Sequence, residues 1–224
     1  MKHTQKIALY NNKGGVAKTT SVINLAYCIQ KAGRKVLVVD CDTQENCYMF
    51  FMTDKRTDGI LPTDYDNICH TTWTRYAELD ADRISGFDYI MFDLPPAMTD
   101  EVKQIIRHSG LVYVPTMLGE FEIHGLERVT VEIARQQARI GGIFITMYRR
   151  RNDEELLRDF RSALDSTLLQ TIIPYSDTVR ESQKAGLPLE AYFTEKKVPR
   201  SGSSWKIVNA YENLTDEILR RSEV

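Results

Sequence analysis

The stretch KIALYNNKGGVAKTT, residues 6–20, decides the fold because it joins three kinds of local structure in a fixed order. Its first part, residues 7–10, is an apolar run typical of a buried strand. A Gly-Gly pair then allows a tight turn, and Lys18 and Thr19 begin a helix. Backbone N–H groups in such a turn, together with the partial positive charge at a helix N-terminus, favour a bound anion. The sequence therefore predicts a phosphate-binding loop.

The side chains of this loop indicate that the anion is a nucleotide. Lys18 is placed to reach the β- and γ-phosphates, and the Thr19 hydroxyl is placed to ligate Mg²⁺. A turn with only a structural role would need neither a cation nor hydroxyls at the start of the helix. The expected nucleotide-binding residues are Lys13, Gly14, Gly15, Val16, Ala17, Lys18, Thr19 and Thr20.

Apolar runs and amphipathic stretches alternate along the rest of the chain. The runs predicted as strands are residues 7–10, 36–39, 89–92, 111–114, 143–145 and 171–173. Most are continuous, as in strands buried on both faces of a parallel sheet. Three helical stripes are Val22, Leu25, Ala26 and Ile29; Leu126, Val129 and Ile133; and Val208, Tyr211, Leu214 and Ile218. This alternation predicts an α/β fold, a doubly wound and mostly parallel sheet with helices on both faces.

Residues 53–86 are the least regular part of the sequence. They are polar and have no sustained hydrophobic period, so we expect them to form a surface excursion. The chain has 224 residues, enough for one well-buried domain and short for two. We therefore expect a single P-loop ATPase domain over residues 1–224.

Composition and charge exclude several classes of protein. The chain is 42% hydrophobic and 27% charged, as in ordinary globular proteins, and its N-terminus has no apolar segment typical of a secretion signal. The four cysteines lack the spacing of a zinc site, which favours reduced thiols and a cytoplasmic protein. With a formal net charge of -2, any binding to nucleic acid must come from a local basic patch.

Three carboxylates follow predicted strands. Asp40 and Asp42 close the run KVLVVDCD, and Asp93 closes DYIMFD. Because the carboxyl ends of parallel strands meet at one edge of a sheet, we expect these side chains beside the bound phosphates. Carboxylates in that position hold the Mg²⁺ shell through water. The predicted magnesium ligands are Thr19, Asp42 and Asp93.

Taken together, these motifs resemble one family, the deviant Walker A ATPases of the ParA/MinD class. Residues 13–20 follow the form K-G-G-x-x-K-T-[ST]. Residues 39–44, VDCDTQ, are similar to V-D-x-D-P-Q, with Thr43 in place of the usual proline. Residues 88–96, DYIMFDLPP, are close to D-Y-x-x-x-D-x-P-P.

The resemblance covers nearly the whole chain, from Lys6 to about Arg221. It is greatest to short plasmid- or mobile-element-type ParA proteins, since no DNA-binding domain precedes the ATPase core. It implies a P-loop ATPase that uses ATP and Mg²⁺. It also implies a role for Lys13, because in this family the lysine before the glycines crosses to the nucleotide of a second subunit. Two ATPs are then sandwiched in a homodimer, and each lysine acts like an arginine finger.

The resemblance implies roles for further residues. Asp42 is expected to orient the attacking water, with Asp40 nearby, so the expected catalytic residues are Lys13, Lys18, Asp40 and Asp42. Slow turnover is expected until a partner completes the site, because an exposed carboxylate is a poor base at neutral pH. Thr146 stands where the family usually has asparagine. The segment IIPYSDTVRESQKAGLPL, residues 172–189, is similar to the part that packs on the base. The expected adenine contacts are Met147, Pro174, Ser176 and Asp177.

ParA relatives bind DNA without sequence preference as ATP-bound dimers. The resemblance therefore implies association with the nucleoid and a ParB-like centromere-binding partner that stimulates hydrolysis. The candidate DNA-contacting clusters are Arg149, Arg150 and Arg151; and Lys196, Lys197, Arg200 and Lys206. Such phosphate contacts would depend steeply on salt. A solvated charge run, offset by nearby acidic residues, is the alternative for either cluster.

Two other functions stay open on the same fold. MinD-type relatives cycle on membranes through a basic C-terminal helix, but the segment YENLTDEILRRSEV, residues 211–224, has an apolar stripe better suited to a core. Its acidic residues disfavour an anionic bilayer, so no membrane partner is expected. A small-molecule ATP-dependent ligase or kinase is the third possibility.

Overall fold

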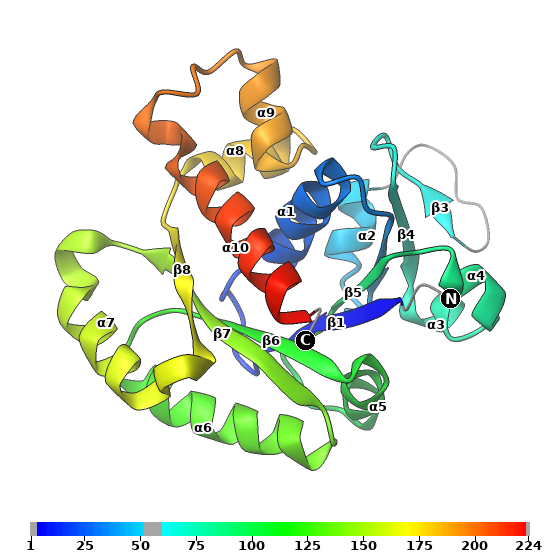
Figure 1. Ribbon diagram of the computed structural model, residues 1–224, viewed down its shortest axis with the longest axis horizontal. Helices are drawn as coiled ribbons and strands as arrows, with labels where there is room; N and C mark the ends of the chain where they lie inside the picture. Colours follow the sequence, from blue (N-terminus) through cyan, green and yellow to red (C-terminus); the bar gives the residue numbers. More distant parts are fainter. Residues whose placement is uncertain (1–3, 52–59, 223–224) are drawn as a thin grey trace.

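The computed structural model describes residues 4–51 and 60–222, which form one sheet with helices on its two faces (Figure 1). The strands are β1 (Gln5–Leu9), β2 (Val36–Asp40), β3 (Leu61–Pro62), β4 (Ile68–Thr72), β5 (Tyr89–Asp93), β6 (Leu111–Thr116), β7 (Arg139–Tyr148) and β8 (Leu168–Pro174). The longer helices are α1 (Lys18–Lys31), α5 (Asp100–Ser109), α6 (Glu120–Arg135), α7 (Arg150–Leu164) and α10 (Lys206–Ser222). The shorter ones are α2 (Asn46–Phe51), α3 (Trp73–Tyr76), α4 (Ala81–Ser85), α8 (Thr178–Lys184), α9 (Leu189–Glu195) and the 3₁₀ turns η1 (Asp165–Thr167) and η2 (Ser203–Trp205).

The eight strands are ordered β3-β4-β2-β5-β1-β6-β7-β8, and every neighbouring pair is parallel except β3 with β4. β1 lies between β5 and β6, so the loop that follows β1 lies at the carboxyl edge over the middle of the sheet. In this type of sheet, ligands bind at that edge where the strand order reverses. The prediction of a doubly wound, mostly parallel α/β fold is confirmed.

Each face of the sheet has its own apolar core. On one face, α1, α2, α9 and α10 pack on side chains such as Ile7, Leu9 and Val38. On the other, α5, α6 and α7 pack on Ala8, Leu37 and alternate strand residues (Figure 1). All three predicted helical stripes are buried, with exposed fractions of 2% or less. Burial of these stripes on both faces holds the central strands, and hence their carboxyl ends, in place.

The expectation that residues 53–86 form only a surface excursion is wrong for β4. Residues 53–59 of that stretch lie outside the described residues, but β4 pairs with β2 along its length, from Val36 with Ile68 to Asp40 with Thr72. His70 and Thr71 of β4 are 1% and 0% exposed. The polar sequence ICHTT conceals this strand, because the Tyr48 and Phe51 rings of α2 cover His70.

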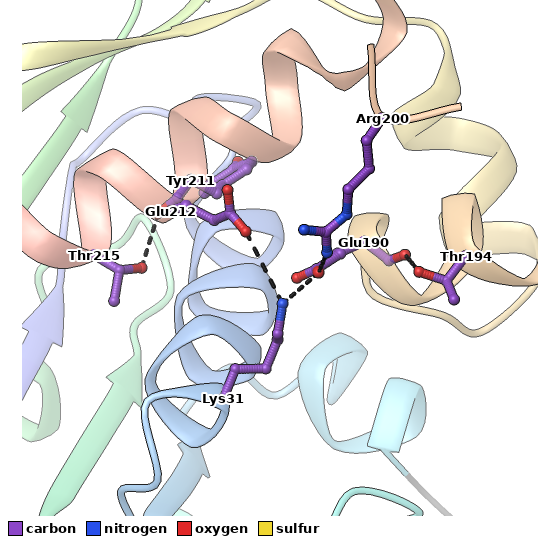
Figure 2. Close-up of polar contacts among 7 residues, drawn as sticks. All are labelled: Lys31, Glu190, Thr194, Arg200, Tyr211, Glu212 and Thr215. Atoms are coloured by element: carbon purple, nitrogen blue, oxygen red, sulfur yellow. Dashed lines mark hydrogen bonds and ion pairs between the residues drawn. The ribbon is translucent and has the colours of Figure 1, made fainter. Parts of the chain in front are cut away.

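A cluster of charges ties the C-terminal end of α1 to α9 and α10 (Figure 2). Glu190 of α9 is 5% exposed, and its Oε1 accepts from both Lys31 and Arg200. Lys31 also lies 4.0 Å from Glu212 of α10. A buried carboxylate requires such partners, because losing its water shell is costly. The cluster therefore holds the segment around residues 190–200 against α1.

Candidate functional site

The loop between β1 and α1 is held in shape by backbone turns and one buried side chain. Gly15 has φ of 74° and Ala17 has φ of 62°, both in the left-handed region. Asn11 is 3% exposed; its amide donates to the Pro115 carbonyl at 2.8 Å and its Oδ1 accepts from the Lys13 N–H at 3.0 Å. Asn11 thus fixes the loop against β6, which the sequence alone did not indicate.

Lys18 lies inside this loop rather than in solvent. Its side chain is 8% exposed, and its ammonium donates to the carbonyls of Asn11 at 3.1 Å and Lys13 at 2.9 Å. Burial lowers its pKa, and the nearby Asp93 and Asp42 oppose that shift. A cation held by neutral carbonyls in a cavity can exchange them for phosphate oxygens, which bind an ammonium more strongly.

The three predicted carboxylates do meet at the edge of the sheet. Asp40 and Asp93 end neighbouring strands and pair in register. Both oxygens of Asp40 are used, one accepting from the Asp42 N–H at 3.0 Å and the other from the Tyr48 N–H at 2.7 Å. Asp40 therefore shapes the turn that presents Asp42. Asp42 is half-buried and lines the same cavity as Lys18 and Thr19.

Asp93 is the least satisfied of the three carboxylates. It is 1% exposed, and neither oxygen makes a hydrogen bond of regular geometry within the described part of the chain. Burial raises its pKa to about 7; the adjacent Thr19 hydroxyl and Lys18 lower it, while Asp40 and Asp42 raise it. A bound cation would remove the penalty that this buried carboxylate carries. The donor set of one hydroxyl and two carboxylates suits Mg²⁺, which also takes phosphate oxygens and water.

No cluster of three or more His, Cys, Asp or Glu side chains forms a ready metal cage among the described residues. Mg²⁺ bound with a nucleotide does not require one, because the phosphates and waters supply most ligands. Thr19, Asp42 and Asp93 are therefore compatible with a magnesium ion that arrives with its nucleotide.

Two adjoining cavities lie over the loop. One, of about 390 Å³, is lined by Gly14, Gly15, Ala17, Lys18, Thr19, Thr20, Asp42, Pro96 and Met147. The second, of about 210 Å³, shares Ala17, Thr20 and Met147 with the first. Its other walls include the predicted base contacts Pro174, Ser176 and Asp177. The predicted phosphate-loop and base-contact residues thus line two adjoining cavities, except Lys13 and the buried Val16, which line neither.

Two further residues, Thr146 and Gln183, make hydrogen bonds at this site that the sequence analysis did not predict. The Thr146 hydroxyl lies 3.1 Å from the Thr116 carbonyl and 3.3 Å from the Val16 carbonyl, so it joins β7 to the loop. Gln183 of α8 donates to the Thr20 hydroxyl at 3.1 Å. Both contacts join segments more than 100 residues apart in sequence, so local pattern gives no signal for Val16–Thr146 or Thr20–Gln183.

Lys13 points away from the cavity of its own subunit. Its ammonium donates to Glu122 of α6 at 2.8 Å, and it is not among the residues that line either cavity. Its side chain is 36% exposed and that of Glu122 is 18% exposed. The two lysines of the loop therefore differ: Lys18 lies within the site and Lys13 lies on its rim.

The predicted basic clusters lie at the surface. Lys196, Lys197, Arg200 and Lys206 are all exposed. Arg200 also pairs with Glu190, and its guanidinium lies 5.0 Å from the centre of the Trp205 ring. Arg149 is exposed and stacks 3.9 Å over the Tyr175 ring. The side chains of Arg150 and Arg151 lie outside the described part of the chain. None of the helices described is long and apolar enough to cross a bilayer.

The chain is similar in sequence to known nucleotide-binding proteins. Residues 7–189 match the family model of the CobQ/CobB/MinD/ParA nucleotide binding domain. The chain is 27% identical to the chromosome partitioning protein ParA of Caulobacter vibrioides in an alignment of 259 positions, which covers 96% of this chain and 94% of that protein.

Solved structures share the fold. The Pyrococcus furiosus cell division ATPase MinD superposes with a TM-score of 0.77 at 21% identity, covering 97% of this chain and 99% of that one. The Pyrococcus horikoshii septum site-determining protein MinD, complexed with Mg-ADP, superposes with a TM-score of 0.73 at 19% identity, covering 96% of each chain. At these identities the superpositions show a common architecture.

Proposed function

Because the chain belongs to the CobQ/CobB/MinD/ParA nucleotide-binding domain family, we propose that it is a ParA-type partitioning ATPase that binds ATP with Mg²⁺ at the β1–α1 loop. The observation that carries this proposal is that Lys18 and Thr19 line one cavity and both interact with the buried, unsatisfied Asp93. The match to the Caulobacter partitioning protein, which covers 96% of this chain and 94% of that protein, supports the partitioning role.

Each group at the site has a proposed role. Lys18 and the loop N–H groups hold the phosphates, and Thr19, Asp42 and Asp93 hold the magnesium shell. When bound, Mg²⁺ neutralises the charge that develops on the phosphates. Asp42 orients the attacking water, and Asp40 keeps Asp42 in place through the backbone. Met147, Pro174, Ser176 and Asp177 flank the base. Hydrolysis is slow until a centromere-binding partner of the ParB type acts.

Lys13 supplies the proposed oligomeric switch. It lies on the rim of the loop, half-exposed and outside its own cavity, which suits a cation that crosses to the nucleotide of a second subunit. The ATP-bound homodimer then binds DNA without sequence preference through exposed basic side chains such as Lys196, Lys197 and Lys206. We assign residues 1–224 to one P-loop ATPase domain, supported by the packing of α10 on α1 and β8.

The burial of α10 favours this function over membrane cycling. Its apolar stripe, Val208, Tyr211, Leu214 and Ile218, is 2% exposed or less, so it already packs in the core. A membrane-binding helix needs a free apolar face. Retention on a nucleoid in the cytoplasm is therefore the proposed location.

The test of the proposal is to measure molecular mass in solution with and without Mg·ATP, for the wild type and Lys13→Ala. We expect the wild type to dimerise with ATP and the variant to bind ATP but stay monomeric. A wild type that remains monomeric, or a variant that dimerises equally well, contradicts the sandwich. Strict dependence on Lys13 also argues against a small-molecule ligase.

DNA binding provides a second, independent measurement. Non-specific duplex should be retained only with ATP, and raising salt from about 50 to 200 mM should weaken binding by orders of magnitude. DNA affinity that is indifferent to nucleotide would exclude the proposed cycle.

A further inference from the structure

The Lys13–Glu122 ion pair lies between two segments that are distant in sequence but adjacent in the sheet. Lys13 is in the loop after β1, and Glu122 is in the first turn of α6, which follows β6. The ammonium and Oε1 are 2.8 Å apart. With 18% of its side chain exposed, against 36% for Lys13, Glu122 is the more buried member of the pair.

Two glycines, Gly119 at the N-cap of α6 and Gly125 within the helix, lie beside this pair. A Cβ at Gly119 would lie 1.9 Å from Oε2 of Glu122, so a side chain there would force the carboxylate out of its position. A Cβ at Gly125 would lie 3.6 Å from Cε of Lys13, so the lysine stem passes directly over this glycine. The φ of Gly119 is 176°, which any residue can adopt. Glycine at position 119 is therefore explained by the space that the Glu122 carboxylate occupies, and not by the backbone conformation.

The position of Glu122 also suits a carboxylate that holds a cation. It lies in the first turn of α6, where the partial positive charge of the helix stabilises a negative side chain. The lysine ammonium is a compact charge with three donors, so the Glu122 carboxylate and a phosphate compete for the same group. While Lys13 is bound to Glu122, it is not extended toward a second subunit.

A large apolar side chain is exposed beside this pair. Phe121, directly before Glu122, is 79% exposed, the largest exposed fraction among the large apolar side chains described. An exposed apolar ring thus directly precedes the carboxylate that holds Lys13, the residue proposed above to reach a second subunit.

We propose that Glu122 is a positioning residue that holds Lys13 on its own subunit until the nucleotide of a second subunit displaces it, so that the pair sets the ATP and protein concentrations at which dimers form. This inference rests on the proposed function. Two such pairs open for every dimer formed. Each partly exposed pair opposes dimerisation by about two- to fivefold, so together they oppose it by about four- to twenty-fivefold.

The test compares dimer dissociation constants, measured by analytical ultracentrifugation at saturating Mg·ATP, for Glu122→Gln and Glu122→Ala. Both variants should dimerise more tightly than the wild type, by about four- to twenty-fivefold for the alanine variant. Glu120→Gln is the matched control, because it removes the same charge from the same helical turn while the Lys13–Glu122 pair stays intact. Thermal unfolding of each variant checks that the fold is unchanged.

A double-mutant cycle makes the assignment specific. In the Lys13→Ala background, which is expected to stay monomeric with Mg·ATP, Glu122→Gln should not restore dimers, since there is no ammonium to release. Equal effects of Glu120→Gln and Glu122→Gln, weaker dimers in the Glu122 variants, or a Glu122 effect that persists without Lys13 would each overturn the inference. If the wild type dimerises and the Glu122 variants match it, only this inference fails. If the wild type stays monomeric under ATP, the proposed function fails with it.

Discussion

The two ends of α1 both carry lysines, but their partners differ in kind. At the C-terminal end, Lys31 binds a buried carboxylate that Arg200 shares and lies near a second carboxylate, Glu212 (Figure 2). At the loop end, among the described residues, the Lys18 ammonium donates to backbone carbonyls and the Lys13 ammonium donates to Glu122. The first arrangement holds segments together, whereas the second leaves cations that an incoming phosphate can take over.

The buried carboxylates near the two ends of α1, Glu190 and Asp93, also differ in their partners. Glu190 at the far end has two cations on Oε1, although its Oε2 has no hydrogen-bond partner among the described residues, while neither oxygen of Asp93 at the loop end has one there. The backbone differs as well, because Ala17 before α1 is left-handed and Ala32 after it is not. Asp93 and Ala17 thus place an unsatisfied charge and a left-handed residue beside the proposed ligand site, features that functional sites often carry.

The largest expected effect separates the lysines at the two ends of α1. Lys18→Ala should lower ATP turnover by at least about 100-fold, because it removes the cation that faces the phosphates. Lys31→Ala should leave turnover within about twofold, since its partners lie at the opposite end of the helix. Phosphate release at saturating Mg·ATP measures both. Equal losses in the two variants would mean that Lys18 acts through stability alone.

The sequence alone was sufficient to predict the phosphate-binding loop, six of the strands and the three buried helical stripes. Each carries a strong local signal: a glycine turn before Lys18, continuous apolar runs, or helical spacing such as Val22, Leu25 and Ile29. The sequence also predicted that Asp40 and Asp93 lie side by side, because the carboxyl ends of parallel strands share one edge of the sheet.

The remainder depends on contacts between distant segments. β4 was hidden because ICHTT is polar, and only packing against Tyr48 and Phe51 makes His70 a buried residue. The Lys13–Glu122 pair joins residues 109 apart, so no local pattern could indicate it. Lys13 was predicted to matter, but its partner within the subunit was not predicted.

The second largest effect is expected at Asp93, where a substitution in the core should raise the free energy of unfolding rather than lower it. Burial raises the pKa of Asp93 to about 7, above its unfolded value near 4, so its stability contribution is present at acid pH and lost as pH rises through 7. Asp93→Asn should therefore increase the free energy of unfolding at pH 8 by on the order of 2 to 4 kcal/mol. Urea unfolding at pH 5 and pH 8 should show the gain widening with pH. A variant less stable than the wild type at pH 8 would contradict this account.

At the other end of α1, the corresponding change should destabilise. Glu190→Gln leaves Lys31 and Arg200 without their shared anion, but these side chains are 37% and 69% exposed and water can solvate them. We therefore expect a loss of about 1 to 2 kcal/mol, less than for a fully buried pair. Glu212→Gln, at a 40% exposed position 4.0 Å from Lys31, is the control and should change stability by less than about 0.5 kcal/mol. A larger effect at Glu212 would assign the anchoring role to α10 instead.

The smallest effect concerns the backbone at the same two ends. Ala17 has φ of 62° and ψ of 33°, a conformation that costs an alanine about 1 to 2 kcal/mol and a glycine little. After the greater freedom of glycine in the unfolded chain is subtracted, Ala17→Gly should stabilise by about 0.5 to 1 kcal/mol. Ala32, with φ of -75°, has no such strain, so Ala32→Gly should destabilise by a similar amount. Urea unfolding without nucleotide measures both. Changes of the same sign would show that the strain is not confined to the loop, and that the two ends of α1 differ in their charges alone.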